Sequence, residues 1–252
     1  MLGAALAVAA LYCGSPRPGY AQGGPPMLTD DPGTPGSSSW EINVAYGQEN
    51  TDQAHVHSVP HVDVNYGLGE RIQLKYETAW LRSAPTASGQ SESGVDDSLL
   101  GLKWRFLDRE RAGFDMSVYP QLQIENSGSS VARGVAEPGP NLFLPVEVGL
   151  TVGRAKLVGE VGYQYFDARE NEWVIGLLSA FRLSEKRELL AELRGVGRGF
   201  LDQDDVILNV GLRQELGSRL RLAASVGTGL THGEDTTSLT AYVGIQLLLN
   251  EK

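Results

Sequence analysis

Hydrophobic and polar residues alternate with a period of two along most of the chain from Trp40 onward. The first such stretch, residues 40–47, reads WEINVAYG, and the last, residues 239–247, reads LTAYVGIQL. Alternation of this kind places apolar side chains on one face of a β-strand and polar or small ones on the other. Counted along the chain, the pattern predicts twelve strands and an all-β fold.

The connections between these predicted strands alternate in length. Short ones are expected at residues 66–71, 107–113, 152–155, 183–188 and 216–219, and generally longer, polar ones at residues 47–54, 83–95, 126–139, 167–171, 197–203 and 231–236. An even number of strands with short turns on one side and longer loops on the other is typical of an outer-membrane barrel. We therefore predict a closed, antiparallel transmembrane β-barrel of about twelve strands, an up-and-down meander over residues 40–249.

Period two alone also fits a soluble secreted β protein, whose apolar face would point inward, and this alternative stays open. The aromatic residues favour lipid, because nine of them lie on the apolar face near strand ends. They are Trp40, Tyr66, Phe106, Phe114 and Phe181 at one end, and Tyr46, Trp80, Tyr165 and Trp173 at the other. Two such girdles anchor a barrel at the two membrane interfaces.

The N-terminal region predicts export. The apolar segment MLGAALAVAALY is followed by Gly19-Tyr20-Ala21, a small-x-small cleavage site, so we expect a signal peptide over residues 1–21 and passage through the periplasm to the cell outer membrane. The only cysteine, Cys13, lies in this leader, so the mature protein would have no thiol chemistry. Residues 22–39 are rich in Gly, Pro, Ser and Asp and are predicted to be an extended N-terminal arm.

Charge excludes one class of partner and suggests a polar lumen. With 21 Lys and Arg against 31 Asp and Glu, the formal net charge is −10, which argues against nucleic-acid binding. Charged residues of both signs share the polar faces of the strands, where ion pairs across a lumen would offset their desolvation. The residues predicted to line a pore are Lys75, Glu77, Lys103, Arg105, Asp115, Glu160, Arg194 and Arg213.

No catalytic or metal-binding pattern stands out. By parity, His55, His57 and His61 share the polar face of the second strand with Asp63, but residues two apart on a strand stand about 6–7 Å apart, wide for chelating one ion. We interpret them as polar residues that face the lumen. Neither a nucleophile paired with a base nor a glycine-rich loop before a helix is recognisable, so we predict no enzyme, no cofactor and no metal site.

Three strings carry a resemblance to a known family. They are the Asp-Asp-Pro-x-Thr-Pro-Gly arm (30–36), the Asn-Tyr-Gly-Leu-Gly turn (65–69) and the Gly-x-Lys-Trp-Arg-Phe strand (101–106). Across essentially the whole mature chain, the sequence resembles the MetA-pathway of phenol degradation family, a group of predicted outer-membrane barrel transporters. The resemblance implies outer-membrane lipid and a small-molecule solute as partners, and it brings no defined solute site.

The expected function is therefore a channel or transporter for small organic compounds, aromatic or hydrophobic ones among them. The alternative is a structural or surface-binding barrel with a closed lumen, in which the loops at 83–95 and 126–139 bind a partner. No motif in the sequence specifies the solute or the oligomeric state.

Overall fold

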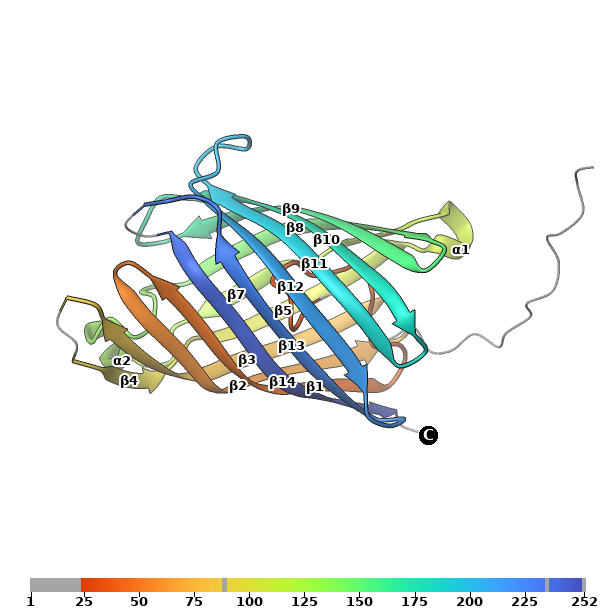
Figure 1. Cartoon of the computed structure of the whole chain (residues 1–252), viewed down its shortest axis with the longest axis horizontal. Coiled ribbons are helices and arrows are strands. Elements are labelled where there is room, and N and C mark those ends of the chain that lie inside the picture. The colour runs from red at the N-terminus through yellow and green to blue at the C-terminus, as the bar shows by residue number, and fades with distance from the viewer. Residues whose placement is uncertain (1–23, 88–89, 234–235, 251–252) are drawn as a thin grey trace, which may run out of the picture.

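A computed structural model of the chain describes residues 24–87, 90–233 and 236–250. It forms one antiparallel sheet in which neighbours along the chain pair with each other (Figure 1). The sheet closes because β1 pairs with β14 from Ser39↔Asn250 to Thr51↔Thr237. The strands are β1 (Ser39–Thr51), β2 (Ala54–Leu68), β3 (Ile72–Pro85), β4 (Glu92–Val95), β5 (Ser98–Leu107), β6 (Asp115–Val118), β7 (Gln121–Ile124), β8 (Asn141–Val152), β9 (Ala155–Phe166), β10 (Glu172–Ser184), β11 (Arg187–Gly197), β12 (Asp205–Glu215), β13 (Leu220–Gly229) and β14 (Thr237–Asn250).

These fourteen segments make a twelve-stranded wall, because two wall strands are interrupted. Both β4 and β5 pair with β3, on either side of Asp96-Asp97. Both β6 and β7 pair with β5 and β8, on either side of Tyr119-Pro120, where the proline has no N–H to donate to a ladder. The predicted closed barrel of twelve strands is confirmed.

Two single-turn helices, α1 (Arg109–Ala112) and α2 (Gly128–Ala132), lie in connections at opposite ends of the barrel (Figure 1). In the described part of the chain, neither is long and apolar enough to cross a membrane. The short-turn end of the barrel carries α1 and the connections at 69–71, 108–114, 153–154, 185–186 and 216–219. The opposite, long-loop end carries α2.

Two predicted loops are longer than the connections that the structure shows. In the stretch at 83–95, β3 continues to Pro85 and β4 spans Glu92–Val95. The stretch at 47–54 is mostly strand, since β1 continues to Thr51 and β2 begins at Ala54. Gln48, Glu49 and Asn50 are polar in succession, yet their backbones pair with both β14 and β2. Where a strand extends beyond lipid, both of its faces meet water, so the period-two signal disappears while the backbone ladder continues.

The two faces of the barrel wall have opposite character. On β5, the outward-facing Leu102 and Trp104 are 48% and 52% exposed, whereas Lys103 between them is fully buried inside. The same alternation continues around the barrel, with buried inward-facing polar residues such as Glu41, Asn43, Asp63, Asn65, Glu147, Glu160, Glu192 and Asn209. An apolar outer band is stable in lipid and unfavourable in water, which contradicts the soluble alternative.

The N-terminal arm does not extend away from the barrel. Residues 24–38, hereafter the arm, lie inside the lumen as the red segment seen between the strands in Figure 1. Thr29, Asp31 and Thr34 are almost completely buried there. The predicted signal peptide, residues 1–21, lies outside the described residues.

Candidate functional site: the lumen and its arm

The arm enters the lumen at the short-turn end. Next to the start of β1, the Ser38 backbone N–H donates to the Gly67 carbonyl at 2.9 Å. Further in, the Thr34 hydroxyl donates to the Glu70 carbonyl at 2.9 Å. Both acceptors belong to the end of β2 and its turn, so this turn fixes the direction in which the arm enters.

Two wall carboxylates satisfy backbone donors of the arm at mid-lumen. Glu192 on β11 accepts from the Leu28 N–H at 3.2 Å and, through its other oxygen, from the Thr29 N–H. Glu160 on β9 accepts from the Asp30 N–H at 3.3 Å. A buried backbone N–H without an acceptor costs free energy. The two carboxylates provide the acceptors that a neighbouring strand would provide within a sheet.

Two wall lysines hold the acidic residues of the arm. Lys103 on β5 donates to Asp30 Oδ1 at 2.9 Å and also to the Asp31 carbonyl, while Lys156 on β9 pairs with the Asp31 carboxylate. Burial acts to raise the pKa of the Asp31 carboxyl, but Lys156 and Lys103 outweigh burial and hold that pKa below its ordinary value. Asp31 is therefore ionised while the arm is docked.

This shift predicts how docking depends on pH. A carboxyl whose pKa falls on docking stabilises the docked state above its ordinary pKa of about 3.9 and loses that effect as pH falls further. We expect conductance of the reconstituted protein to rise as pH falls below about 4. This acid step should be smaller in Asp31→Asn. An unchanged step in Asp31→Asn would contradict this role.

The first residues of the arm, 24–27, rest against β9 to β13. Arg213 donates to the Gly24 and Pro25 carbonyls at 3.2 and 3.1 Å, and the Ser225 hydroxyl donates to the Pro26 carbonyl at 2.7 Å. Met27 inserts between inward-facing apolar side chains, hereafter the apolar socket. The socket consists of Val158, Leu178, Ala180 and Leu190.

The opposite side of the lumen is a polar ladder that runs from wall strand to wall strand. Asp63 accepts from Asn43 at 3.1 Å and from Asn65 at 2.9 Å, and Gln73 donates to Asn65 at 2.7 Å. Lys75 lies 2.6 Å from Glu77, whose carboxylate is also 2.8 Å from His61. Polar groups that satisfy one another can remain buried without water.

The structure places the predicted pore residues in three settings. Lys103, Glu160 and Arg213 contact the arm. Lys75 and Glu77 belong to the polar ladder. The others are spread along the inner face: Arg105 donates to the Glu70 carbonyl, Asp115 accepts from the Arg109 N–H near α1, and Arg194 lies on β11. Whether a solute passes these eight residues stays a prediction.

The predicted set omits two wall residues that hold the arm, Glu192 and Lys156, and the arm residues that dock, Asp30, Asp31 and Met27. Parity alone places Glu192 and Lys156 on the polar face, but it does not tell a wall contact from a contact with the arm. The signal in the sequence was the pair of adjacent aspartates in a segment otherwise poor in charge. Buried carboxylates of this kind need buried cations, which the inner wall supplies.

The interpretation of the three histidines as one face is wrong. Between Ser58 and His61, β2 has one more residue than either neighbouring strand, a β-bulge that reverses the parity of the outer part of the strand. The His57 ring stacks on Tyr46 with its Nδ1 2.7 Å from the tyrosine hydroxyl, whereas His61 reaches the inward-facing Glu77. Among the described residues, no group of three or more His, Cys, Asp or Glu is placed to hold a metal ion.

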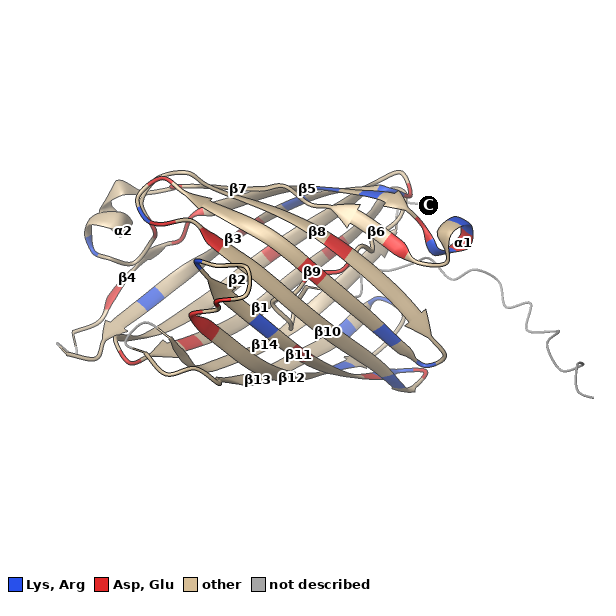
Figure 2. Cartoon of the chain, turned by 90° about the horizontal axis from the view of Figure 1, so that it is seen from above, with Lys and Arg blue, Asp and Glu red and all other residues tan. Residues whose placement is uncertain are grey.

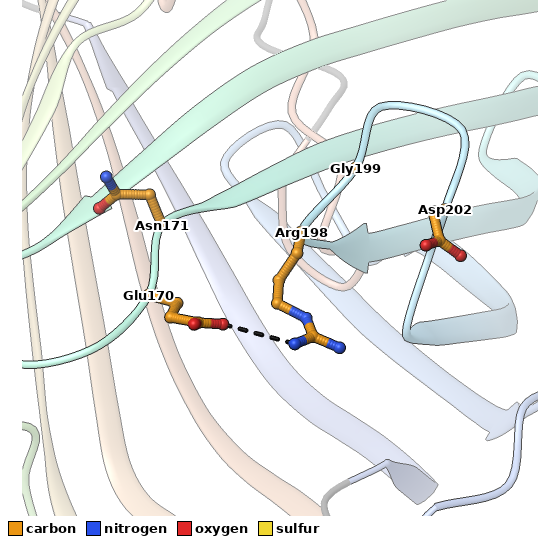
Figure 3. A pocket seen from close by; sticks show the side chains of 5 residues that line it. All are labelled: Glu170, Asn171, Arg198, Gly199 and Asp202. Carbon is orange, nitrogen blue, oxygen red and sulfur yellow. Dashed lines mark ion pairs between the residues drawn. The ribbon is translucent and has the colours of Figure 1, made fainter.

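A separate hollow of about 510 Å³ lies at the long-loop end, between residues 167–171 and 198–204 (Figure 3). Arg198 pairs with Glu170 at 3.5 Å across it and with Asp204 at 3.3 Å. Hydrogen bonds from Arg198 hold the pKa of the exposed Asp204 carboxyl below its usual value. These contacts connect two loops outside the lumen, and exposed pairs of this kind add little stability.

The closed wall, its apolar outer band and its polar lumen define a transmembrane β-barrel of the outer-membrane type. No family model matches the chain, and a sequence comparison with curated proteins found no match. Among solved structures, the COG4313 outer membrane channel from Pseudomonas putida F1 is similar with a TM-score of 0.66, over 88% of this chain and 100% of that chain at 16% identity. The KdgM porin (TM-score 0.57, 81% and 98% covered, 12% identity) and the NanC porin (0.58, 82% and 98%, 8%) share the fold.

Proposed function

We propose that this protein is an outer-membrane channel for small organic compounds that have an apolar part, and that the docked arm closes it. The observation that carries the proposal is the apolar socket, a cluster of Val158, Leu178, Ala180 and Leu190 on an inner wall rich in polar and charged residues. Its occupant, Met27, belongs to a segment held only by hydrogen bonds, ion pairs and packing. Removal of the arm would uncover the socket without breaking the wall.

The socket gives an apolar solute a physical advantage over a purely polar one. A ring or short aliphatic chain that replaced the Met27 side chain would gain about 25 cal/mol for each Å² of apolar surface it buries. Its acidic end would meet the two lysines that now hold the aspartates of the arm, Lys103 and Lys156. Small-molecule sites are usually lined by apolar side chains, with a few polar groups that orient the ligand.

The fold shared with outer-membrane channels and the resemblance to the phenol-degradation family support the same proposal. Both fit an outer-membrane location and passage of a solute. The charged lumen and the apolar socket together favour aromatic or aliphatic acids over sugars.

Uptake of two anions of similar charge tests the proposal. In proteoliposomes that hold the protein lacking residues 24–36, in which the socket is uncovered, we expect benzoate to pass faster than gluconate. The preference should fall when Leu190→Ala is added, because this substitution truncates one of the two leucines of the socket. The matched control is Leu189→Ala, the neighbouring residue, whose side chain is exposed on the outer face. Equal uptake of both anions, or no uptake through a folded barrel, would sink the proposal.

A surface-binding barrel with a closed lumen is the second candidate. It is favoured by the way the loop containing α2 folds onto β4, where Arg133 donates to the Ser93 carbonyl at 2.9 Å and pairs with Glu92. A barrel that conducts neither with its arm nor without it would support this candidate.

A further inference from the structure

The two ends of the barrel differ in charge (Figure 2). In the described residues of the long loops, seven acidic residues stand against three basic ones, all arginines at 133, 169 and 198. In the connections of the short-turn end, six basic residues stand against four acidic ones. A barrel that is acidic at one end and basic at the other presents different surfaces to the two leaflets.

Three basic residues lie at two adjacent turns of the short-turn end, together with one acid, Glu185. Arg154 lies in the turn between β8 and β9, Lys186 in the turn between β10 and β11, and Arg187 begins β11. Among the described residues none of these three forms an ion pair with an acid, whereas at the same end Arg71 and Arg221 do, with Asp108 and Glu215. In the described part of the chain, Arg109 and Arg219, at two other connections of this end, also have no ion pair with an acid. We call Arg154, Lys186 and Arg187 the basic cluster.

Specific contacts hold the two arginines of the basic cluster at the outer face. The Arg154 guanidinium donates to the Leu183 carbonyl at 2.7 Å and lies 5.8 Å from the centre of the Phe181 ring. Arg187 donates to Gln214, its cross-strand partner, at 2.6 Å. These contacts use part of each guanidinium group, which has five donors in all.

The outer wall beside the basic cluster is apolar and uncovered. Phe181, Leu183, Leu189 and Leu216 are 43–58% exposed on it. An aromatic ring at the end of an aliphatic band marks the level of the lipid headgroups. The cationic groups therefore stand where phosphates of the adjoining leaflet would lie, with acyl chains against the leucines.

We propose that the basic cluster binds the headgroup of an anionic phospholipid in the leaflet that the short turns reach. Guanidinium groups suit phosphate because their donors match two of its oxygens, and Lys186 adds a point charge. The lipid is favoured over free phosphate, since only the lipid also covers Leu183 and Leu216. The inference rests on the transmembrane fold and is independent of the solute that the lumen takes.

Lipid binding to the full-length protein tests the inference. We would measure by native mass spectrometry how many phosphatidylglycerol and phosphatidylethanolamine molecules stay bound after release from mixed nanodiscs. Wild type should retain phosphatidylglycerol preferentially, and each substitution Arg154→Gln, Lys186→Gln or Arg187→Gln should weaken that binding roughly fivefold. Inorganic phosphate in millimolar excess should not displace the lipid.

The matched control is the triple variant Arg133→Gln, Arg169→Gln, Arg198→Gln, which makes the same change in net charge at the long-loop end. It should retain phosphatidylglycerol like wild type. Its counterpart combines Arg154→Gln, Lys186→Gln and Arg187→Gln and should lose the preference for phosphatidylglycerol. If that variant fails to fold, Lys186→Gln with Arg187→Gln leaves the Arg154 contacts intact and should still weaken binding about 25-fold. The inference is overturned if the basic-cluster variants bind like wild type, if the control loses as much, if both lipids bind equally, or if phosphate competes.

Discussion

Deletion of residues 24–36 is expected to raise the single-channel conductance of this barrel severalfold. The deletion removes Met27 from the apolar socket and the two aspartates from their lysines, and it leaves every wall strand intact, since β1 begins at Ser39. A twelve-stranded wall is wider than the eight-stranded barrels that their own side chains fill. Water would then hydrate the freed carboxylates and ammonium groups, so the lumen would stay open rather than collapse.

The measurement is current through planar bilayers that contain wild-type or arm-deleted protein. A deletion of the same length in the long-loop end, residues 127–139, provides the control and should leave conductance near the wild-type value. Heat-modified migration on gels and a β-type circular dichroism spectrum would establish that each barrel is folded. If the arm-deleted barrel folds and its conductance is unchanged, the side chains of the wall, and not the arm, limit the conductance.

The wall could be predicted from the sequence because lipid enforces the pattern. Outward residues within the membrane are apolar and the inner face tolerates polar residues, so residues 100–106 of β5 and 239–247 of β14 alternate. The signal fails where that constraint ends. Beyond the lipid, polar residues on both faces of the strands hid the outermost pairs between β1 and β2. One inserted residue at the Ser58–His61 bulge reversed the parity of His57; Pro60 inside the bulge is its mark in the sequence, and a count of period two does not use it.

The arm could be delimited by composition but could not be placed. Its contacts join residues far apart in sequence, such as Thr29 with Glu192, and they use backbone N–H groups that every residue has. Lys103, Glu160 and Arg213 were predicted to face the lumen, and parity was sufficient for that. Their engagement with the arm depends on the shape of the lumen, which the closure of β1 onto β14 determines.

A small residue in the wall offers the sharpest test of docking, because the arm passes very close to Gly176 on β10. A Cβ atom at this position would overlap the Thr29 hydroxyl and lie 2.8 Å from its Cγ2. Thr29 cannot simply step aside, since Glu192 holds its N–H and its side chain is β-branched. We therefore expect Gly176→Val to expel the arm and raise conductance toward the value of the arm-deleted protein.

Two further variants separate expulsion of the arm from damage to the wall. Gly159→Val makes the same change on the adjacent strand β9, where a Cβ would meet nothing within 4 Å, and should conduct like wild type. Thr29→Gly combined with Gly176→Val removes the side chain that clashes and should restore low conductance. If Gly176→Val stays closed in a folded barrel, or if the double variant stays open, the close fit at Gly176 does not control the arm. If the double variant has low conductance again, the absence of a side chain at Gly176 is what allows the arm to dock and close the lumen.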